Sequence, residues 1–131
     1  MRTIILVVAL AACVGGFGVA ALRSTRRAEA AARASVLTGG DPERGKLQAR
    51  ALGCVACHVI PGVRGPQSNV GPSLADFATR NFLAGATENT PDQVRQFLRD
   101  PRSVAPKSAM PKIPMTDSDA RDLSAYLYTL R

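Results

Sequence analysis

The sequence is short of the residues from which most metal and redox sites are built. Its 131 residues include one His, three Cys and no Trp. A zinc site of the usual kind takes four Cys or His ligands, and Cys13 lies in an apolar run apart from the other candidates, so a zinc site is not expected. Beyond residue 40 only about 91 residues remain, near the lower limit for a self-sufficient core. A covalent cofactor or staple is therefore expected.

Acidic residues are also scarce, with 10 Asp+Glu against 17 Lys+Arg and a net charge of +7. Residues 1–40 hold five arginines against Glu29 alone, so much of the excess lies near the N-terminus. In residues 41–131 basic and acidic side chains are interspersed and form no basic stripe. This distribution argues against nucleic acid as a partner.

A long hydrophobic run stands near the N-terminus. Residues 4–22 are free of charged side chains, and 19 such residues are enough to cross the ~30 Å hydrocarbon core as a helix. We therefore predict a transmembrane signal anchor at residues 1–22. An Ala- and Arg-rich tether at residues 23–40 follows, ends in a flexible Gly-Gly break, and leads to a folded domain at residues 41–131.

Two other fates of the N-terminus stay open. Ala28-Glu29-Ala30 has the small-x-small form of a signal cleavage site, and Leu10-Ala11-Ala12-Cys13 resembles a lipobox in which Cys13 would carry a lipid. Four arginines follow the hydrophobic run and one precedes it, a balance that by itself places the folded domain in the cytoplasm. The chemistry described next requires export, and we give it precedence.

The segment Cys54-Val55-Ala56-Cys57-His58 has the C-x-x-C-H pattern of covalent haem attachment. Two thiols three positions apart in a short turn reach both vinyl groups of one haem edge, and the adjacent His58 then falls below the ring, where it can bind the iron. A thioredoxin-like redox pair would need a βαβ context that this sequence lacks. We predict one covalently attached haem c.

The second axial ligand of the iron must come from another residue type, because there is no second His. The candidates are Met110, Met115, Lys107, Lys112 or no residue at all. Met110 is favoured because it lies in a proline-stiffened, helix-free loop between two predicted helices. Met115 directly precedes a helix start and is interpreted as a packing residue.

Three helix starts are readable in the folded domain. Asp41 and Thr90 each stand before a proline, which suits an N-cap followed by the first helical residue, and Thr116 precedes a run of helix-forming residues. Gly45 lowers helix propensity inside the first of these helices, so close packing against another helix is expected. No two-residue hairpin signal is present, so we predict an all-α domain with helices at residues 42–52, 91–100 and 117–130.

Residues 41–131 resemble a class I cytochrome c. The matching pieces occur in the family's order and are Gly45, Cys54-Val55-Ala56-Cys57-His58, Gly71-Pro72-Ser73-Leu74, Met110-Pro111, and Leu123 with Tyr126. The resemblance implies a small cytochrome c fold around one haem, with His58 and Met110 as iron ligands. It also implies that the Pro72 carbonyl accepts a hydrogen bond from His58, and that Gly45 packs against Tyr126.

Residues 70–101 are similar to the cytochrome c domain fused to subunit II of caa3-type oxidases, although the copper-binding domain of such subunits is missing. The resemblance implies an electron carrier, not an enzyme, that binds no small-molecule substrate. We expect it in the bacterial inner membrane as a single-pass protein with its haem domain on the periplasmic side. Its expected partners are membrane lipid and respiratory or photosynthetic complexes, with a quinol-oxidising complex as donor and a terminal oxidase as acceptor.

Two alternative functions stay open. One is a haem subunit with a sensing or assembly role, and the other is a haem peroxidase, although a distal His is missing. Five apolar side chains are expected to surround the haem, namely Leu74, Phe77, Phe82, Phe97 and Leu98. Three basic side chains in loops are expected near its edge, where they would meet an acidic partner or remain ordinary solvated charges, namely Arg64, Lys107 and Lys112.

Overall fold

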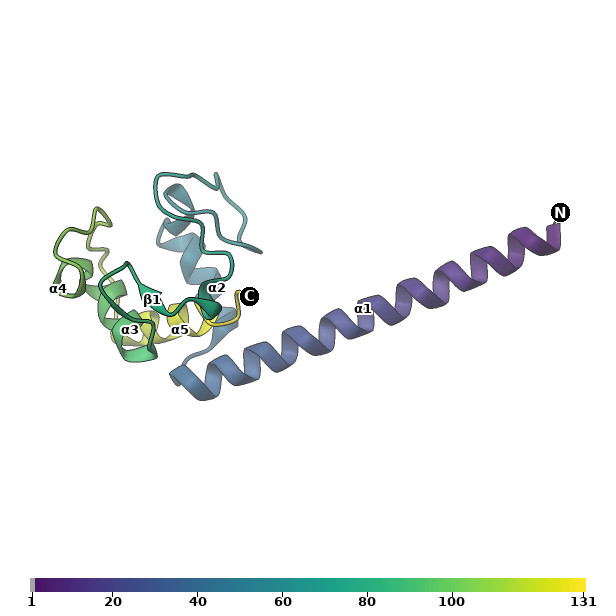
Figure 1. The fold of residues 1–131 in the computed structure, drawn as a ribbon, viewed down its shortest axis with the longest axis horizontal. Helices are drawn as coiled ribbons and strands as arrows, with labels where there is room; N and C mark the ends of the chain where they lie inside the picture. Colours follow the sequence, from purple (N-terminus) through teal and green to yellow (C-terminus); the bar gives the residue numbers. More distant parts are fainter. Residues whose placement is uncertain (1) are drawn as a thin grey trace. The chain divides into compact units, whose positions relative to one another are not determined.

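The computed structural model describes the backbone from residue 2 to residue 131, and it describes residue 16 and residues 18–131 in full. The chain divides into two compact units, one ending at Ala30 and one comprising Ala31–Arg131. Helix α1 (Arg2–Thr38) supplies the first unit and the opening residues of the second. The second unit contains all the other elements and every predicted site residue (Figure 1).

The predicted membrane span, residues 4–22, falls mostly on residues outside those described in full, and so does Cys13. Among the residues that the structure does describe, no helix has an apolar stretch long enough to cross a membrane.

Three helices of the second unit begin where the sequence predicts. Helix α2 (Pro42–Ala51) is capped by Asp41, whose carboxylate accepts from two backbone N–H groups of the first turn at 2.9 and 3.2 Å. Helix α3 (Pro91–Arg99) is capped by the Thr90 hydroxyl. Helix α5 (Asp117–Leu127) starts with a capping box, because Thr116 and Asp119 each bond the other's backbone N–H. The local cap chemistry thus determines all three starts.

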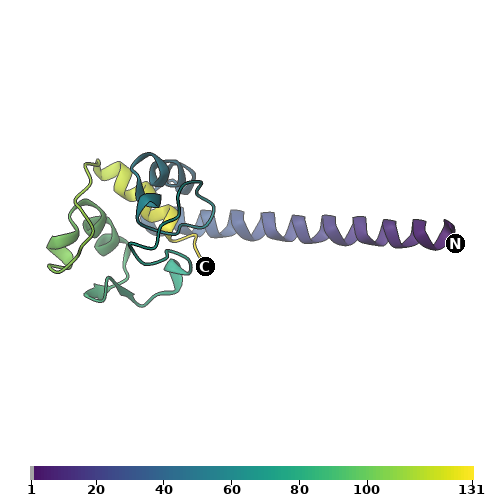
Figure 2. The same ribbon diagram turned by 90° about the horizontal axis from the view of Figure 1, so that it is seen from above.

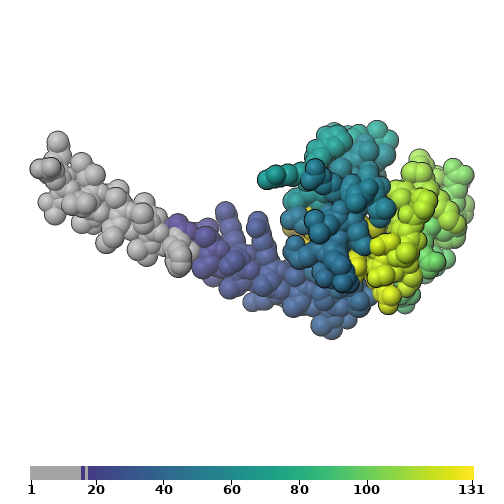
Figure 3. Space-filling view, turned by 180° about the vertical axis from the view of Figure 1, so that it is seen from behind, coloured from purple at the N-terminus to yellow at the C-terminus, as the bar shows by residue number. Residues whose placement is uncertain are grey.

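Helix α5 is the central element of the second unit and packs against both α2 and α3. In the two ribbon views it runs as the yellow helix beside blue α2 and green α3 (Figures 1 and 2). Figure 3 shows the same order on one face of this unit, with the α5 residues between blue and green surfaces. The buried core therefore gathers around α5, whose Ala120, Leu123, Tyr126 and Leu127 are all less than 9% exposed.

Two glycines allow the chain to approach α5 closely. A Cβ on Gly45 would collide with the backbone carbonyl of Asp122, and a Cβ on Gly40 would collide with that of Arg121. The predicted close packing of Gly45 is confirmed, but its nearest neighbour is the Asp122 backbone and not Tyr126. The predicted flexible break at residues 39–40 is likewise a tight packing contact, since Gly40 lies directly against a helix backbone.

Two features of the predicted fold need correction, the absence of strands and the helix-free loop. Strands β1 (Phe82–Leu83) and β2 (Thr87–Glu88) form a small antiparallel pair, so the domain is mostly helical. The turn between them places Ala84 and Gly85 at positive φ, and an alanine there gives no readable hairpin signal. Helix α4 (Pro101–Val104) adds one helical turn at the start of the loop predicted to be helix-free, because a proline suits the first position of a helix.

Candidate functional site

A short turn after α2 presents the two cysteines and the histidine together. Gly53, at φ +75°, leads from α2 into the 3-10 helix η1 (Cys54–Ala56). The Cys54 carbonyl accepts from the backbone N–H groups of Cys57 and His58 at 3.2 and 3.0 Å, which folds the segment back on itself. All three side chains consequently line one cavity. Burial raises the pKa of the Cys54 thiol above its ordinary value, so the free thiol is protonated at neutral pH.

The His58 ring is held from behind by residues 71 and 72. Its Nδ1 lies 2.7 Å from the Pro72 carbonyl oxygen. Because a carbonyl can only accept, Nδ1 carries the proton and donates it, which leaves the lone pair of the neutral ring on Nε2. Gly71 lies so close that an added Cβ would collide with the imidazole. Gly71 therefore acts on the site by close approach, a role that the sequence analysis did not assign to it.

Two backbone hydrogen bonds fix this arrangement. The Gly71 N–H donates to the Cys57 carbonyl at 2.7 Å, and the Leu74 N–H donates to the Val59 carbonyl at 2.8 Å. These bonds tie the Pro72 segment to the chain on either side of His58. The orientation of the imidazole is thus set by backbone geometry and not by solvent-exposed side chains.

The cavity has a volume of about 1010 Å³ and a mainly apolar wall. It reaches the upper end of the ~300–1,000 Å³ range of small-molecule and cofactor sites. Its wall is formed by residues from α2, from η1 and the segment between η1 and β1, from β1 and the turn after it, and from α3, α5 and the loop after α4. Apolar side chains dominate this wall, among them Ala49, Ile60, Leu74, Phe77, Leu83, Val94, Phe97, Leu98, Ile113, Leu123 and Leu127. Four of the five apolar side chains predicted to surround the haem are among them.

The fifth prediction, that Phe82 surrounds the haem, is wrong. Phe82 is 64% exposed and lies outside the cavity wall, whereas its neighbour Leu83 is 6% exposed and belongs to it. Successive side chains of a strand point to opposite faces, so the burial of Leu83 turns Phe82 outward. The alternation could not be anticipated without knowing that β1 is a strand.

Arg80 and Lys107 are the formally charged side chains of the cavity wall. The guanidinium of Arg80 donates to the carbonyls of Ser73 and Ala75, and it stacks on the Phe77 ring with its carbon atom 5.7 Å from the ring centroid. Both hydrogen-bond partners are neutral carbonyls, so these bonds leave the positive charge of the guanidinium at the cavity wall uncompensated. Sequence analysis missed Arg80, because nothing in its immediate neighbourhood distinguishes it from a surface arginine.

An amide anchors this wall from the other side. The Asn89 side chain donates to the carbonyls of Phe77 and Arg80, at 3.0 Å each. Tyr128 donates to the Asn89 side-chain oxygen at 3.0 Å, and burial raises the pKa of Tyr128 to about 12. The rings of Phe77 and Tyr128 meet edge to face at 5.9 Å. The backbone next to Arg80 is thereby tied to the C-terminal end of α5.

The candidates for a second iron ligand are divided between two hollows. Met110 and Lys107 line the cavity that holds His58. Met115 and Lys112 line a separate groove of about 560 Å³ beside α3. Lys112 is held there by Asp100, with 2.9 Å between Nζ and Oδ2, and this hydrogen bond lowers the pKa of the Asp100 carboxyl.

A search of known protein families assigns most of this chain. The family model "Cytochrome c" matches residues 42–131, which include all the cavity-lining residues. The chain belongs to the cytochrome c family. In this cytochrome c domain the Cys54–Cys57 pair, in a turn at the edge of an apolar cavity, is consistent with one covalent haem c, as predicted.

Curated relatives of this cytochrome c are oxidase subunits. It is 33% identical over 79 residues to cytochrome c oxidase subunit 2 of Alkalihalophilus pseudofirmus, an alignment that covers 60% of this chain and 22% of the relative. The corresponding proteins of Bacillus sp. (strain PS3) and Bacillus subtilis are 33% and 32% identical, and 23% of each is covered. The predicted resemblance to oxidase subunit II is confirmed, and the cytochrome c spans less than a quarter of these relatives.

Proposed function

We propose that this cytochrome c is a membrane-anchored carrier of single electrons. In this proposal the electron passes from a quinol-oxidising complex to a terminal oxidase on the periplasmic side of a bacterial inner membrane. The similarity to cytochrome c oxidase subunit 2 supports an oxidase as acceptor. The 19-residue uncharged run at residues 4–22 supports the anchor, followed by a tether at residues 23–40 and the haem domain from residue 41.

The observation that carries the proposal is that Cys54, Cys57, His58 and Met110 line one apolar cavity. Each thiol would add across one vinyl group and so retain the haem in a domain with little surface to grip it. His58 would bind the iron through Nε2, because Nδ1 is engaged by the Pro72 carbonyl. Met110 would supply the second ligand to the iron, since its thioether lines the same cavity as His58, whereas Met115 and Lys112 line the other groove.

When bound, a haem c supplies one Fe(II)/Fe(III) couple that takes up and releases a single electron. The apolar wall excludes water and disfavours the more highly charged oxidised state. The Arg80 guanidinium in the cavity wall would supply a positive charge that can pair with a carboxylate of the haem. Backbone contacts hold His58 in place and a proline-rich loop holds Met110, so both residues would remain the ligands of the iron in both oxidation states.

Covalent attachment is the first prediction to test. We expect haem staining on a denaturing gel to be full in the unaltered chain and absent in the Cys54→Ser, Cys57→Ser double variant, because neither thiol remains to form a thioether. Cys13→Ser is the matched control and should stain fully. Full staining of the double variant would overturn the site.

The absorption spectrum of the detergent-purified full chain tests the carrier function. A low-spin spectrum that carbon monoxide does not change indicates two protein ligands on the iron and supports electron transfer. A high-spin spectrum, or ready binding of carbon monoxide, would contradict the assignment of Met110 and favour catalysis or gas sensing.

Mass spectrometry of the same sample distinguishes an intact anchor from a cleaved signal or a lipid on Cys13.

A further inference from the structure

The chain leaves His58 in a loop that returns to it. Residues 60–70 form turns and bends without a helix or strand, and we call them the return loop. Directly after this loop the Gly71 N–H donates to the Cys57 carbonyl at 2.7 Å, and the Pro72 carbonyl oxygen lies 2.7 Å from Nδ1 of His58. The position of this carbonyl therefore depends on the conformation of the return loop.

A single side chain holds the return loop from the inside. The Oε1 atom of Gln67 accepts from the Ile60 N–H at 2.7 Å, and its Nε2 donates to the Ile60 carbonyl at 3.4 Å and to the Val63 carbonyl. One amide thus engages both polar backbone groups of Ile60, which is 1% exposed and lines the haem cavity. Removing the amide would take this partner from a buried N–H, and an unpaired buried donor is costly.

The backbone of Gln67 adopts a conformation that is unfavourable for a glutamine. Its φ is +53°, in the left-handed region that favours glycine. Residues persist in such conformations where the surrounding structure determines their position, and they cluster at functional sites. A glycine here would relieve the strain but would supply no amide. The presence of glutamine therefore points to a role for the side chain and not for the backbone.

The return loop also lies against the turn that carries the two cysteines. A Cβ on Gly65 would collide with the Val55 side chain of η1, and the Ser68 N–H donates to the Val55 carbonyl at 3.4 Å. From α5 the Tyr126 hydroxyl donates to the Pro61 carbonyl. The loop is thus held between η1 and α5, and the glutamine amide fixes its shape from within.

We propose that Gln67 is a positioning residue for the iron ligand His58. Its amide acts through Ile60 and the loop backbone, and it holds the return loop in the conformation that presents the Pro72 carbonyl to Nδ1. This hydrogen bond orients the imidazole and raises the basicity of Nε2, the atom assigned to the iron. The inference rests on the proposed haem ligation, and it adds a residue outside the cavity wall to the groups that control the ligand.

The test compares Gln67→Met with Gln96→Met in the full chain with its haem. Methionine keeps the length of the side chain and removes the amide. Gln96 is the matched control, because it is an exposed glutamine on α3 whose amide donates to the Ser103 hydroxyl at 3.4 Å. NMR of the reduced protein follows the exchange of the His58 Nδ1 proton with solvent. We expect exchange about tenfold faster in Gln67→Met, because the loop opens more easily, and within about twofold of the unaltered chain in Gln96→Met.

Gln67→Gly separates positioning by the amide from relief of backbone strain. Glycine adopts the left-handed conformation freely, so this variant removes the amide without leaving a strained residue. We expect fast Nδ1 exchange here too, and a midpoint potential shifted in the same direction as in Gln67→Met. Slow Nδ1 exchange in Gln67→Gly would show that the strain and not the amide matters, and it would overturn the proposal.

A structural role alone gives a different pattern of exchange. If Gln67 only stabilised the fold, its variants would speed the exchange of the Leu123 backbone N–H in α5 by the same factor as that of the His58 Nδ1 proton, with an unchanged midpoint potential. That result would also overturn the positioning role. We expect the Leu123 N–H to change less than the Nδ1 proton in both variants.

The absorption spectrum of the unaltered chain distinguishes two possible failures. If His58 does not bind the iron together with a second ligand, the unaltered chain gives no low-spin spectrum, and the proposed function fails before any variant is compared. If the low-spin spectrum is present and both Gln67 variants exchange the Nδ1 proton no faster than Gln96→Met, the proposed function stands and the positioning role is wrong.

Discussion

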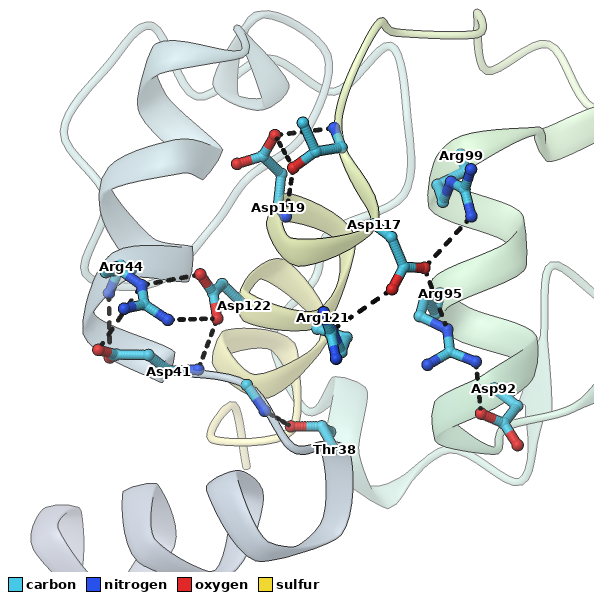
Figure 4. A network of polar contacts seen from close by, with 12 residues as sticks. Thr38, Asp41, Arg44, Asp92, Arg95, Arg99, Asp117, Asp119, Arg121 and Asp122 are labelled. Carbon is cyan, nitrogen blue, oxygen red and sulfur yellow. Dashed lines mark hydrogen bonds and ion pairs between the residues drawn. The ribbon is translucent and has the colours of Figure 1, made fainter.

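Two hollows of the described domain differ in their chemistry. The haem cavity, of about 1010 Å³, has a mainly apolar wall with Arg80 and Lys107 as its charged side chains. The groove beside α3, of about 560 Å³, is bordered by three aspartates and three basic residues. In the groove Asp117 pairs with Arg95, Arg99 and Arg121, and Asp100 pairs with Lys112 (Figure 4 shows the Asp117 pairs).

The two hollows differ in how many charged side chains they hold and in how those charges are paired. In the groove each basic side chain is matched by a carboxylate, so the charges hold α3, α5 and the loop after α4 together. In the cavity the charges are nearly absent, which leaves the space suited to a large apolar cofactor. Charged side chains that are paired with one another, as in the groove, therefore do not by themselves make a charged binding surface.

Each hollow contains one methionine, and this gives the largest expected effect. Met110→Ala should convert the low-spin spectrum to a high-spin one and allow carbon monoxide to bind, because the cavity then offers the iron no thioether. Met115→Ala is the matched control and should leave the spectrum unchanged, since Met115 lines the groove. Optical spectra of both oxidised and reduced variants decide the matter. The reverse pattern would make Met115 the ligand and Met110 a packing residue.

The sequence predicted the features that depend on neighbouring residues. Caps at Asp41, Thr90 and Thr116 act within one helical turn, so their helices begin as expected. Features that depend on distant segments were missed or misplaced. Arg80 lines the cavity because Asn89 and Phe77 fix the loop around it, and Phe82 faces outward because its strand buries the next residue.

Gly71→Ala should give the next largest effect, because the new methyl group would occupy the space of the His58 ring. We expect the imidazole to shift away from the Pro72 carbonyl, which weakens the Nδ1 hydrogen bond and lowers the basicity of Nε2. The measurement is the midpoint potential together with the rate of haem incorporation. Gly18→Ala is the control, since nothing lies within 4 Å of a Cβ there. Identical potentials for the two variants would contradict a positioning role for Gly71.

A buried carboxylate and an exposed one should contribute differently to the free energy of unfolding. The Asp122 carboxylate, whose side chain is 3% exposed, accepts from the Arg44 guanidinium at 2.9 Å and from the Asp41 N–H at 2.7 Å. Asp122→Asn should lower the free energy of unfolding by about 2 kcal/mol, measured by urea denaturation. Asp117→Asn, with its side chain 44% exposed, is the comparison and should cost less.

The same buried carboxylate predicts an acid dependence. Burial alone would raise the pKa of Asp122, but the hydrogen bonds from Arg44 and Asp41 outweigh it and hold the pKa below the ordinary value of 3.8. A lowered pKa means that the stabilisation is present above pH 3.8 and is lost as the pH falls through the folded-state value. The unaltered chain should therefore lose stability in this window, and Asp122→Asn should lose less. Parallel pH profiles would contradict this assignment.

The smallest expected effects belong to the two lysines, and they compare the hollows most directly. Lys107→Met removes an exposed charge of the cavity wall, and we expect a change of less than about twofold in the rate of oxidation by membrane vesicles at low salt. Lys112→Met removes a charge that Asp100 already compensates, so the rate should not change measurably. A severalfold drop for Lys112→Met would mean that the ion pair opens to meet an acidic partner. In that case the groove beside α3 would lie in the docking surface, and its ion pairs would serve partner binding as well as the stability of the fold.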